Sequence, residues 1–383
     1  MTGAQDVRLV CIAPDTVVPP ISGSAARTFG LAAAVRPHLG GVEIRCFSNV
    51  AAPISPPSAL DVVHIPRPST GAARVRYLAT ALLGRRLGYQ FPPSSLADGR
   101  GLVQLASPLL YEGARRAGLR RFVLDAHNVY QDMTEFPQAS LRDRVFYRVT
   151  RRRQARMEAE CWAAASHIFF CSTVDRGRAE RLTPGVAARS TIVPNCVDTR
   201  AFTPRPAAAF TGGGPVIFVG TMRYPPNFFA AQEICHELAP ALPDLPFWIV
   251  GEAPYRPARI PDNVRFLGRV ESTAAPLAAA RVAVAPVRHG SGTRLKLLEY
   301  FAAGLPVVCT AKSAEGLDVV DGTHVRLAET PAAFVDAIRN LHGNAPASAA
   351  LGSAGRTLVE EQYDWRAWVP GLLEVYVAQA PAC

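Results

Sequence analysis

A lysine and a glutamate stand three residues apart in the segment Gly290–Cys309, whose sequence is GSGTRLKLLEYFAAGLPVVC. The pattern predicts a glycine-rich loop, an amphipathic helix, a glycine stop and a buried strand, so Lys296 and Glu299 share one helical face. A carboxylate placed like Glu299 can accept two hydrogen bonds from vicinal hydroxyls, as acidic residues do with ribose in dinucleotide-binding folds. The alternative is an ordinary i, i+3 salt bridge on a solvated helix.

The loop before this helix has the composition of an anion-binding site. Its two glycines remove steric bulk, so several backbone amides can converge on an anion at the start of the helix. The arginine and the lysine that follow add mobile cations suited to a diphosphate. The lysine stands out because the chain has only one other, Lys312. The segment therefore suits a nucleoside diphosphate, with Gly290, Ser291, Gly292, Thr293, Arg294, Lys296 and Glu299 as the candidate site residues.

Three other loops carry small or polar residues directly after a predicted strand. Gly23 lies in a Ser-Gly-Ser-Ala run whose backbone can approach a ligand, although an ordinary strand-to-helix loop has the same appearance. His127 follows the strand that ends at Asp125 and is either an acid, a base or hydroxyl-binding group, or a capping histidine. Gly220 begins a turn in which Arg223 is either a phosphate contact or a surface arginine.

The elements that must position these residues alternate between strand and helix. Near-continuous apolar strands of this kind predict an α/β protein whose parallel sheets are covered on both faces. We expect two Rossmann-like doubly wound domains that face each other across a cleft, with ligands outside the carboxyl ends of the strands. The predicted strands are Arg8–Ala13, Val42–Ser48, Asp61–Ile65, Leu102–Ala106, Arg121–Asp125, Ile168–Cys171, Thr191–Val193, Val216–Gly220, Pro246–Gly251, Val264–Leu267, Val282–Pro286, Pro306–Thr310 and Val325–Ala328.

Length and charge support two domains. A chain of 383 residues exceeds one ordinary core, and a proline- and glycine-rich stretch near its middle indicates a linker. Residues 1–205 carry 27 arginines against 15 acidic residues, a net charge of +12, whereas residues 206–383 carry 14 basic against 16 acidic residues, a net charge of −2. The predicted division is 1–200, a linker at 201–215, a second domain at 216–362 and a terminal helix at 363–383.

The compartment and the possible partners are also constrained. The start of the chain lacks a signal peptide, and no apolar run approaches the ~20 residues of a transmembrane helix. Eight scattered cysteines without metal-ligand spacing indicate reduced thiols in a cytoplasmic protein. The arginine-rich helix Arg142–Arg156 is either a solvated face or a contact with an anionic acceptor or the inner face of a membrane. It lacks the aromatic platform and motifs of a nucleic-acid binder.

Taken together, the motifs resemble the retaining glycosyltransferases of family 4. The carrying segments are Ile192–Pro204 (IVPNCVDTRAFTP), Phe218–Asn227 (FVGTMRYPPN), the Gly290–Cys309 segment and Glu360–Tyr376. They cover nearly the whole chain in the family's order. The resemblance implies the GT-B architecture, with an acceptor-side first domain, a nucleotide-sugar-binding second domain and a terminal helix that packs back on the first. Gly292–Val308 is similar to the branch of the family with a GTRLKxLEA-type motif.

The resemblance also assigns roles to particular residues. Glu299 matches the glutamate that binds the donor ribose, His127 matches a histidine near the donor sugar, and Gly23 matches the loop that faces the diphosphate. The family's other glutamate falls on Ser291. Many members place an arginine and a lysine where this chain has Thr221 and Pro226, and Tyr300 replaces an alanine. We therefore expect Arg223, Arg294 and Lys296 to supply the missing cations.

The implied reaction moves a sugar from a nucleotide donor, UDP being favoured, to a hydroxyl acceptor with retention at the anomeric carbon. The family generally needs no bound divalent metal, and the departing phosphate oxygen helps to deprotonate the acceptor. Two alternatives stay open at this point: a nucleotide-sugar epimerase, and a non-catalytic binding protein whose donor site has decayed. The Ser291 and Thr221 departures favour the second alternative.

Overall fold

The protein was studied as a computed structural model that describes residues 3–18, 20, 22–48, 60–66, 101–129, 141–206, 210–290 and 293–381. The chain divides into two compact units. Unit 1 comprises Met1–Pro194 with Trp368–Cys383, and unit 2 comprises Asn195–Ala367. Each unit contains its own parallel sheet with helices, so the predicted α/β class with two Rossmann-like domains is confirmed.

Unit 1 is built on a seven-stranded parallel sheet in the order β3-β2-β1-β4-β5-β6-β7. The central strands β1, β4 and β5 are buried along almost their whole length, which explains their apolar sequences. The strands are β1 Arg8–Ala13, β2 Gly41–Ser48, β3 Asp61–Pro66, β4 Leu102–Leu105, β5 Val123–Ala126, β6 His167–Phe170 and β7 Ser190–Ile192.

The helices of unit 1 begin where the sequence offers a capping side chain. The Ser22 hydroxyl accepts a hydrogen bond from the amide of Ala25 at the start of α1, and Ser172 does the same for Asp175 at the start of α5. Trp162 of α4 is fully buried and packs edge-on against Phe170 of β6, which fastens this helix to the sheet. The helices are α1 Gly23–Val35, α3 Tyr111–Arg116, α4 Leu141–Ala164, α5 Thr173–Leu182 and, from the C-terminal part of the chain, α13 Trp365–Gln379.

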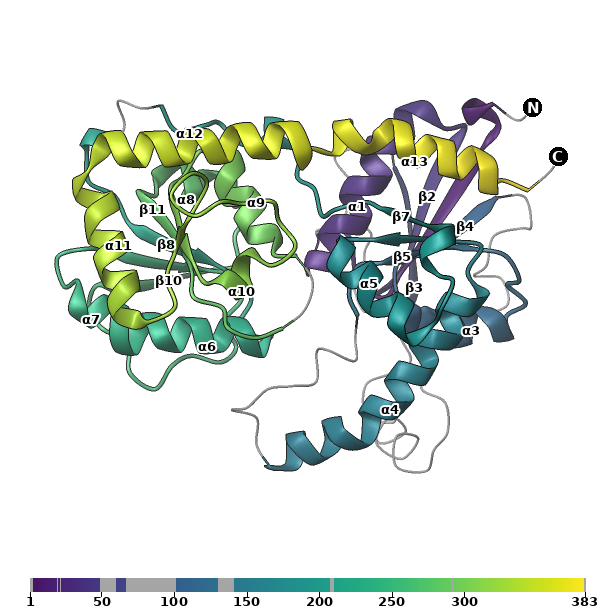
Figure 1. Ribbon diagram of the computed structural model, residues 1–383, viewed down its shortest axis with the longest axis horizontal. Coiled ribbons are helices and arrows are strands. Elements are labelled where there is room, and N and C mark those ends of the chain that lie inside the picture. The colour runs from purple at the N-terminus through teal and green to yellow at the C-terminus, as the bar shows by residue number, and fades with distance from the viewer. Residues whose placement is uncertain are drawn as a thin grey trace. The chain divides into compact units, whose positions relative to one another are not determined.

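Unit 2 has a six-stranded parallel sheet in the order β10-β9-β8-β11-β12-β13. The order reverses between β8 and β11, which are neighbours at the centre of the sheet (Figure 1). This reversal is the topological switch point of a doubly wound sheet. The strands are β8 Val216–Val219, β9 Phe247–Val250, β10 Val264–Gly268, β11 Val282–Ala285, β12 Val307–Cys309 and β13 Arg326–Leu327.

Alternate residues of these strands face two separate hydrophobic clusters. In β11, Val282 and Val284 face one cluster while Ala283 and Ala285 face the other, on which α9 packs. The helices α6 and α11 cover the valine side, and α8 and α9 cover the alanine side. The helices are α6 Pro225–Glu233, α7 Ala239–Ala241, α8 Ala274–Ala279, α9 Leu295–Ala302, α10 Ala311–Ala314, α11 Pro331–Gly343 and α12 Ala345–Gln362, with a π-helical turn at Ile234–Leu238.

All thirteen predicted strands are present in the described part of the chain. Most differ from the prediction by one or two residues at an end, and the last is shortened from Val325–Ala328 to Arg326–Leu327. The division between units falls at Asn195, earlier than the expected boundary at residue 201. The reason is local: the Asn195 side chain donates hydrogen bonds to Thr293, and Val197 bridges to Asp364, both within unit 2.

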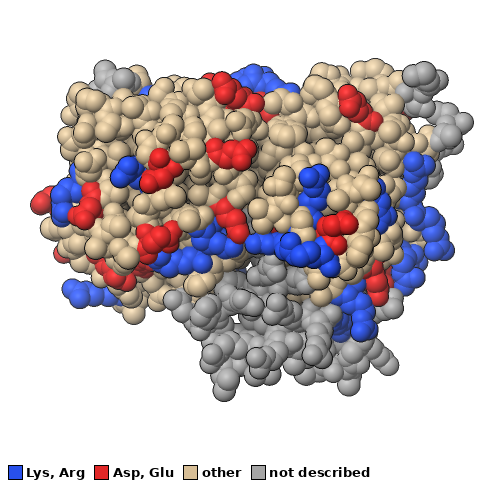
Figure 2. All heavy atoms as spheres, in the orientation of Figure 1, with Lys and Arg blue, Asp and Glu red and all other residues tan. Residues whose placement is uncertain are grey.

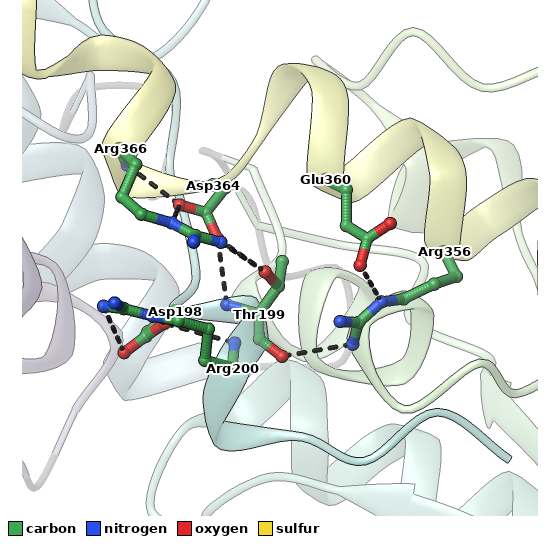
Figure 3. A network of polar contacts seen from close by, with 7 residues as sticks. All are labelled: Asp198, Thr199, Arg200, Arg356, Glu360, Asp364 and Arg366. Atoms are coloured by element: carbon green, nitrogen blue, oxygen red, sulfur yellow. Dashed lines mark hydrogen bonds and ion pairs between the residues drawn. The ribbon is translucent and has the colours of Figure 1, made fainter.

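The two segments at which the chain enters and leaves unit 2 are fastened to each other (Figure 3). The Asp364 carboxylate accepts hydrogen bonds from the backbone amide of Thr199 at 3.1 Å, from its hydroxyl at 2.6 Å, and from the guanidinium of Arg366 at 2.8 Å. Burial raises the pKa of Asp364, but the hydrogen bonds from Arg366 and Thr199 outweigh it and hold the pKa well below its usual range. Arg356 adds a hydrogen bond to the carbonyl of Thr199.

Unit 1 carries most of the chain's positive charge, and on the face of the molecule in Figure 2 its described residues show more basic than acidic side chains. The arginine-rich segment Arg142–Arg156 lies on α4, as expected, although the side chains of residues 141–152 are outside the description. Seven cysteines within the described residues are buried and take part in no disulfide bond there. None of the described helices is both long and apolar enough to cross a bilayer.

Candidate donor-binding site

The loops that follow β8 and β11 diverge at the switch point of unit 2. Pairing between these strands covers only Val216 with Val282 and Ile217 with Ala283, after which the strands separate. The phenol of Tyr300 bridges the separated ends: it accepts a hydrogen bond from the Val219 amide at 2.8 Å and donates one to the Val284 carbonyl at 3.4 Å. The replacement of alanine by tyrosine at position 300 therefore holds the two strand ends at a fixed spacing.

The turn after β8 depends on a close approach of backbone and side chains. A Cβ atom added to Gly220 would lie 2.7 Å from the amide carbon of Asn227, and one added to Gly251 would lie 2.2 Å from the Gly220 carbonyl oxygen. The helix α6 begins at Pro225 and Pro226, as proline favours the first helical positions. The turn is therefore compact, and the side chain of Asn227 is buried beneath it.

Lys296 extends from α9 into this turn rather than toward Glu299. Its ammonium donates a 2.6 Å hydrogen bond to Oδ1 of Asn227 and lies 4.1 Å from the ring centroid of Phe218. Burial lowers the pKa of Lys296, Arg294 lowers it further, and Glu299 opposes both. Although both side chains are described, no ion pair joins Lys296 to Glu299, so the simple i, i+3 salt bridge is absent.

Arg294 and Lys296 were expected to be mobile cations, and the structure corrects this. The Arg294 side chain is only 8% exposed, and its Nη2 donates to the His289 carbonyl at 3.1 Å. Packing fixes both cations because α9 begins against the β8–α6 turn. The loop is held from a second side by Asn195, whose Nδ2 donates to the Thr293 hydroxyl at 2.6 Å and to its carbonyl at 3.1 Å.

Gly290 is required by its conformation and its surroundings. Its φ of +102° is in the left-handed region, and a Cβ atom there would lie 2.3 Å from the Tyr224 hydroxyl and 3.2 Å from Nη2 of Arg294. The chain therefore brings together Gly290, Arg294 and Tyr224 on one side of the turn. Ser291 and Gly292, which were also predicted to be site residues, lie outside the described residues.

Glu299 lies one turn into α9 in a partly buried position. Burial raises the pKa of its carboxyl to about 7, while a hydrogen bond with Thr273 and the charge of Lys296 act in the opposite direction. A carboxyl with this pKa is poised between its neutral and charged forms at neutral pH. Hydroxyl donors from a bound ligand would favour the charged form.

Arg223 takes a different position from the other candidate cations. Its guanidinium forms a two-point ion pair with Glu252, with Nε to Oε2 at 2.8 Å and Nη2 to Oε1 at 2.6 Å. Both side chains are largely exposed, at 62% and 46%. Thr221 lies in the same turn and Pro226 in the first turn of α6, so Arg223 shares this segment but is paired with Glu252.

The candidate residues of unit 1 lie at the carboxyl ends of its own strands. Gly23 is the first residue of α1, and Ser22 caps the N-terminus of this helix. His127 directly follows β5 and is 6% exposed. Burial lowers the pKa of His127, the charge of Asp125 opposes this, and Arg27 adds to the lowering, so the neutral imidazole predominates at pH 7.

A buried ion pair supports the strand that precedes His127. Arg27 of α1 and Asp125 of β5 are both fully buried, with Nη2 and Oδ1 at 2.8 Å. The Nε of Arg27 also donates to Asp125, and its Nη2 and Nη1 donate to the carbonyls of Val193 at 2.9 Å and Pro194 at 2.7 Å. A buried ion pair with these additional hydrogen bonds fixes the relative positions of α1, β5 and the end of β7.

Sequence reasoning missed several residues that shape the donor site. Asn195 belongs to a recognised motif but received no role, and its partner Thr293 is 98 positions away. Tyr224 and Thr273 carried no periodic signal, and Tyr300 was noted only as a departure. Within the described residues, no three histidine, cysteine or acidic side chains are grouped to hold a metal ion.

Comparisons with known proteins agree with this architecture. Residues 214–344 match the family described as "Glycosyl transferases group 1". No curated protein sequence matches the chain significantly. Three solved structures share its fold over almost the full length of both chains. Anabaena HepE in complex with UDP and glucose has a TM-score of 0.68 and 13% identity, with 97% of this chain and 99% of that chain covered. Sucrose-phosphate synthase from Thermosynechococcus elongatus has a TM-score of 0.67, 17% identity and coverage of 97% and 98%, and WaaG, a glycosyltransferase involved in lipopolysaccharide biosynthesis, has a TM-score of 0.64, 15% identity and coverage of 98% and 100%.

At these identities the solved structures establish the fold, and the family match covers the unit that contains the switch-point site. Residues 214–344 therefore match the group 1 glycosyltransferases, and the whole chain has the GT-B fold of these solved structures.

Proposed function

We propose that this glycosyltransferase binds a UDP-type nucleotide sugar at the switch point of unit 2 and transfers the sugar to a hydroxyl acceptor with retention. The observation that carries the proposal is the fixed pair of charges on α9. Lys296 is held in the β8–α6 turn by a neutral amide, and Glu299 lies one turn further along with a carboxyl that can still exchange its proton. A cation for phosphate and a carboxylate for ribose hydroxyls are the two groups that a nucleoside diphosphate requires.

The diphosphate is assigned to the start of α9. Backbone amides at a helix start favour an anion, and Arg294 and Lys296 lie in the first turn. As the donor bond breaks, these groups stabilise the charge that develops on the leaving diphosphate. The backbone of Gly290, with Ser291, Gly292 and Thr293, and the turn at Gly220 form the remaining phosphate contacts in this proposal.

Arg223 joins the site in this proposal only by leaving Glu252. Both side chains of this ion pair are largely exposed to solvent, which weakens it, so a diphosphate can displace the carboxylate at little cost. Arg223 is therefore a donor ligand of secondary importance compared with Lys296.

His127 is proposed to act on the sugar or the acceptor. Its neutral imidazole can accept a proton or a hydrogen bond from a hydroxyl, and the buried Arg27–Asp125 pair keeps its strand in place. Gly23 lets the start of α1 approach the donor diphosphate. The departing phosphate oxygen takes the proton of the acceptor hydroxyl in this proposal, so His127 contributes a hydrogen bond to a hydroxyl rather than acting as the base. The choice of acceptor is assigned to unit 1.

Two neighbours support the choice of donor and acceptor classes. HepE has been described in complex with UDP-glucose, and WaaG takes part in lipopolysaccharide biosynthesis. The arginine-rich part of α4 and the net charge of +12 over residues 1–205, from 27 arginines and 15 acidic residues, support peripheral contact with the anionic inner face of a membrane. Buried cysteines that form no disulfide bond within the described residues support a cytoplasmic location. Co-sedimentation with vesicles of anionic lipid and, separately, of neutral lipid tests the membrane contact. The proposal requires that the protein sediment with the anionic vesicles and not with the neutral ones.

The reaction is tested by incubating the protein with UDP-glucose and other nucleotide sugars, with and without hydroxyl acceptors. Mass spectrometry should show release of the nucleoside diphosphate together with a glycosylated product. The anomeric proton coupling of the product in NMR should match that of the donor. An inverted product would refute retention, and turnover of the sugar without loss of the nucleotide would indicate an epimerase.

A further inference from the structure

The side-chain amide of Asn227 is engaged at both ends. Its Nδ2 donates a 3.0 Å hydrogen bond to the Thr221 carbonyl, and its Oδ1 accepts the 2.6 Å hydrogen bond from Lys296. A carbonyl can only accept and an ammonium can only donate, so the amide has one consistent orientation. The residue is 7% exposed, which leaves the contact little competition from water.

The side chain of Asn227 is held by its surroundings as well as by Lys296. Pro225 and Pro226 set the start of α6, the backbone N–H of Asn227 donates to the Tyr224 carbonyl at 2.9 Å, and Gly220 leaves only enough room for the side chain. A lysine side chain loses rotamer entropy when it is held in one position. An acceptor that is already in place beside the Phe218 ring offsets part of this loss, because the acceptor itself needs no further ordering.

The chemical type of the acceptor is informative. Three other cations of unit 2 are paired with carboxylates: Arg223 with Glu252, Arg288 with Glu233, and Lys312 with Glu315. The described contacts of Lys296 are an amide oxygen and an aromatic ring, and neither cancels a positive charge. An amide thus fixes the position of the ammonium while leaving its charge available to an anion.

We propose that Asn227 is a positioning residue that holds the Lys296 ammonium at the switch point, where it meets the diphosphate of the donor. This inference rests on the proposed function, because it assigns Lys296 to that diphosphate. It makes Asn227 a determinant of donor affinity although the residue does not touch the donor. Asn227 and Lys296 are 69 positions apart and belong to different helices, so their contact also sets the spacing between α6 and α9.

The first test is calorimetric titration of UDP and of uridine into four proteins: wild type, Asn227→Ala, Lys296→Met and the double variant. Methionine keeps the aliphatic stem over Phe218 and removes the charge. We expect Asn227→Ala and Lys296→Met each to weaken UDP binding about tenfold or more, as for a charged hydrogen bond, with little change for uridine. The double variant should bind UDP no more weakly than Lys296→Met. Additive losses would overturn the inference, since Asn227 would then act independently of the lysine.

The second test reads the position of the ammonium without a ligand. Lysine labelled with ¹³C at the ε carbon should give two side-chain signals, from Lys296 and Lys312, because the chain has no other lysine. The Phe218 ring, 4.1 Å from the ammonium, should shift the Lys296 signal, and Asn227→Ala should move that signal toward the Lys312 position. A Lys296 signal unchanged in Asn227→Ala would refute the positioning role.

Failure of the proposed function itself gives a different pattern. In that case UDP, GDP and TDP would all fail to bind the wild-type protein, whereas a failed inference leaves wild-type binding intact and the Asn227 variant unaffected.

Asn227→Asp provides a further check that does not depend on loss of packing: its carboxylate would keep the lysine in place but neutralise the charge of the lysine. Weaker UDP binding in Asn227→Asp, with the Lys296 signal still shifted, supports the inference.

Discussion

Replacing Glu299 by glutamine should make the protein more stable at alkaline pH while weakening nucleotide binding. The pKa of Glu299 rises from an ordinary value of 4.5 to about 7 because burial disfavours the charged form. At about 1.4 kcal/mol per pH unit, this rise corresponds to an ionisation penalty of about 3 kcal/mol for a group fully removed from water. Because the side chain is partly exposed, screening reduces the penalty to about 1–2 kcal/mol.

The sign of the pH dependence follows from which state binds the proton more tightly. The folded protein holds the Glu299 proton more tightly than the unfolded chain, so this residue lowers the stability as the pH rises from about 4.5 to about 7, and its effect is constant above that range. Urea denaturation of the wild type and Glu299→Gln at pH 5 and pH 8 measures the effect. The variant should gain about 1–2 kcal/mol over the wild type on going from pH 5 to pH 8.

The functional half of the prediction uses proton uptake and release. If ribose hydroxyls bind the Glu299 carboxylate, UDP binding at pH 6.5 should release a fraction of a proton. Calorimetric titration in two buffers of different ionisation enthalpy detects this release, which should disappear in Glu299→Gln. Glu271→Gln, at an exposed position of the same unit, serves as the control. The reasoning is refuted if Glu299→Gln and the wild type show the same pH dependence of stability.

Three further predictions concern other parts of the structure. Gly290→Ala should lower the free energy of unfolding by about 1–3 kcal/mol, because Gly290 has a positive φ and an added Cβ atom would collide with the Tyr224 hydroxyl; Tyr224→Phe should recover part of the loss. Gly213→Ala, which has open space around it, should be neutral in the same urea titration. Equal losses in the two glycine variants would contradict the account. Asp364→Asn should lower the free energy of unfolding by about 2 kcal/mol at pH 7. The difference from the wild type should shrink as the pH falls below about 4, because a carboxyl with a depressed pKa stabilises the fold only when it is ionised. A difference in stability that does not depend on pH would contradict this. His127→Ala should reduce kcat for transfer at least tenfold with less than a twofold change in UDP affinity, and an unchanged kcat would remove His127 from the reaction.

The fold was predictable because its signals are local. Continuous apolar runs such as Val282–Ala285 can only be buried strands of a parallel sheet, and their regular alternation with helices leaves few topologies. The ends of strands were less certain, since the residues there leave the sheet to form caps and loops. Tyr300 was visible as an unusual residue, but its bridge between Val219 and Val284 depends on the divergence of two strands that are distant in the sequence.

The sequence selects candidate site residues but does not predict their contacts. Lys296 and Glu299 were selected by their spacing on one helix, which left a salt bridge between them as the alternative interpretation. The structure instead directs Lys296 to Asn227, because the β8–α6 turn offers a buried acceptor that local periodicity cannot reveal. The partnership of Arg223 with Glu252 depends in the same way on two adjacent strand ends. Long-range pairing decides which charges are available to a ligand.

The most direct test of the account is the affinity of the protein for UDP, with GDP and TDP as alternatives, measured by calorimetry for the wild type, Lys296→Met and Lys312→Met. The two variants are matched because they remove the only two lysines of the chain, one in the switch-point turn and one paired with Glu315. We predict that one nucleoside diphosphate binds the wild type, that Lys296→Met weakens this binding about tenfold or more, and that Lys312→Met leaves it unchanged. Absence of binding by all three nucleotides, or equal affinities in the two variants, would contradict a donor site centred on Lys296.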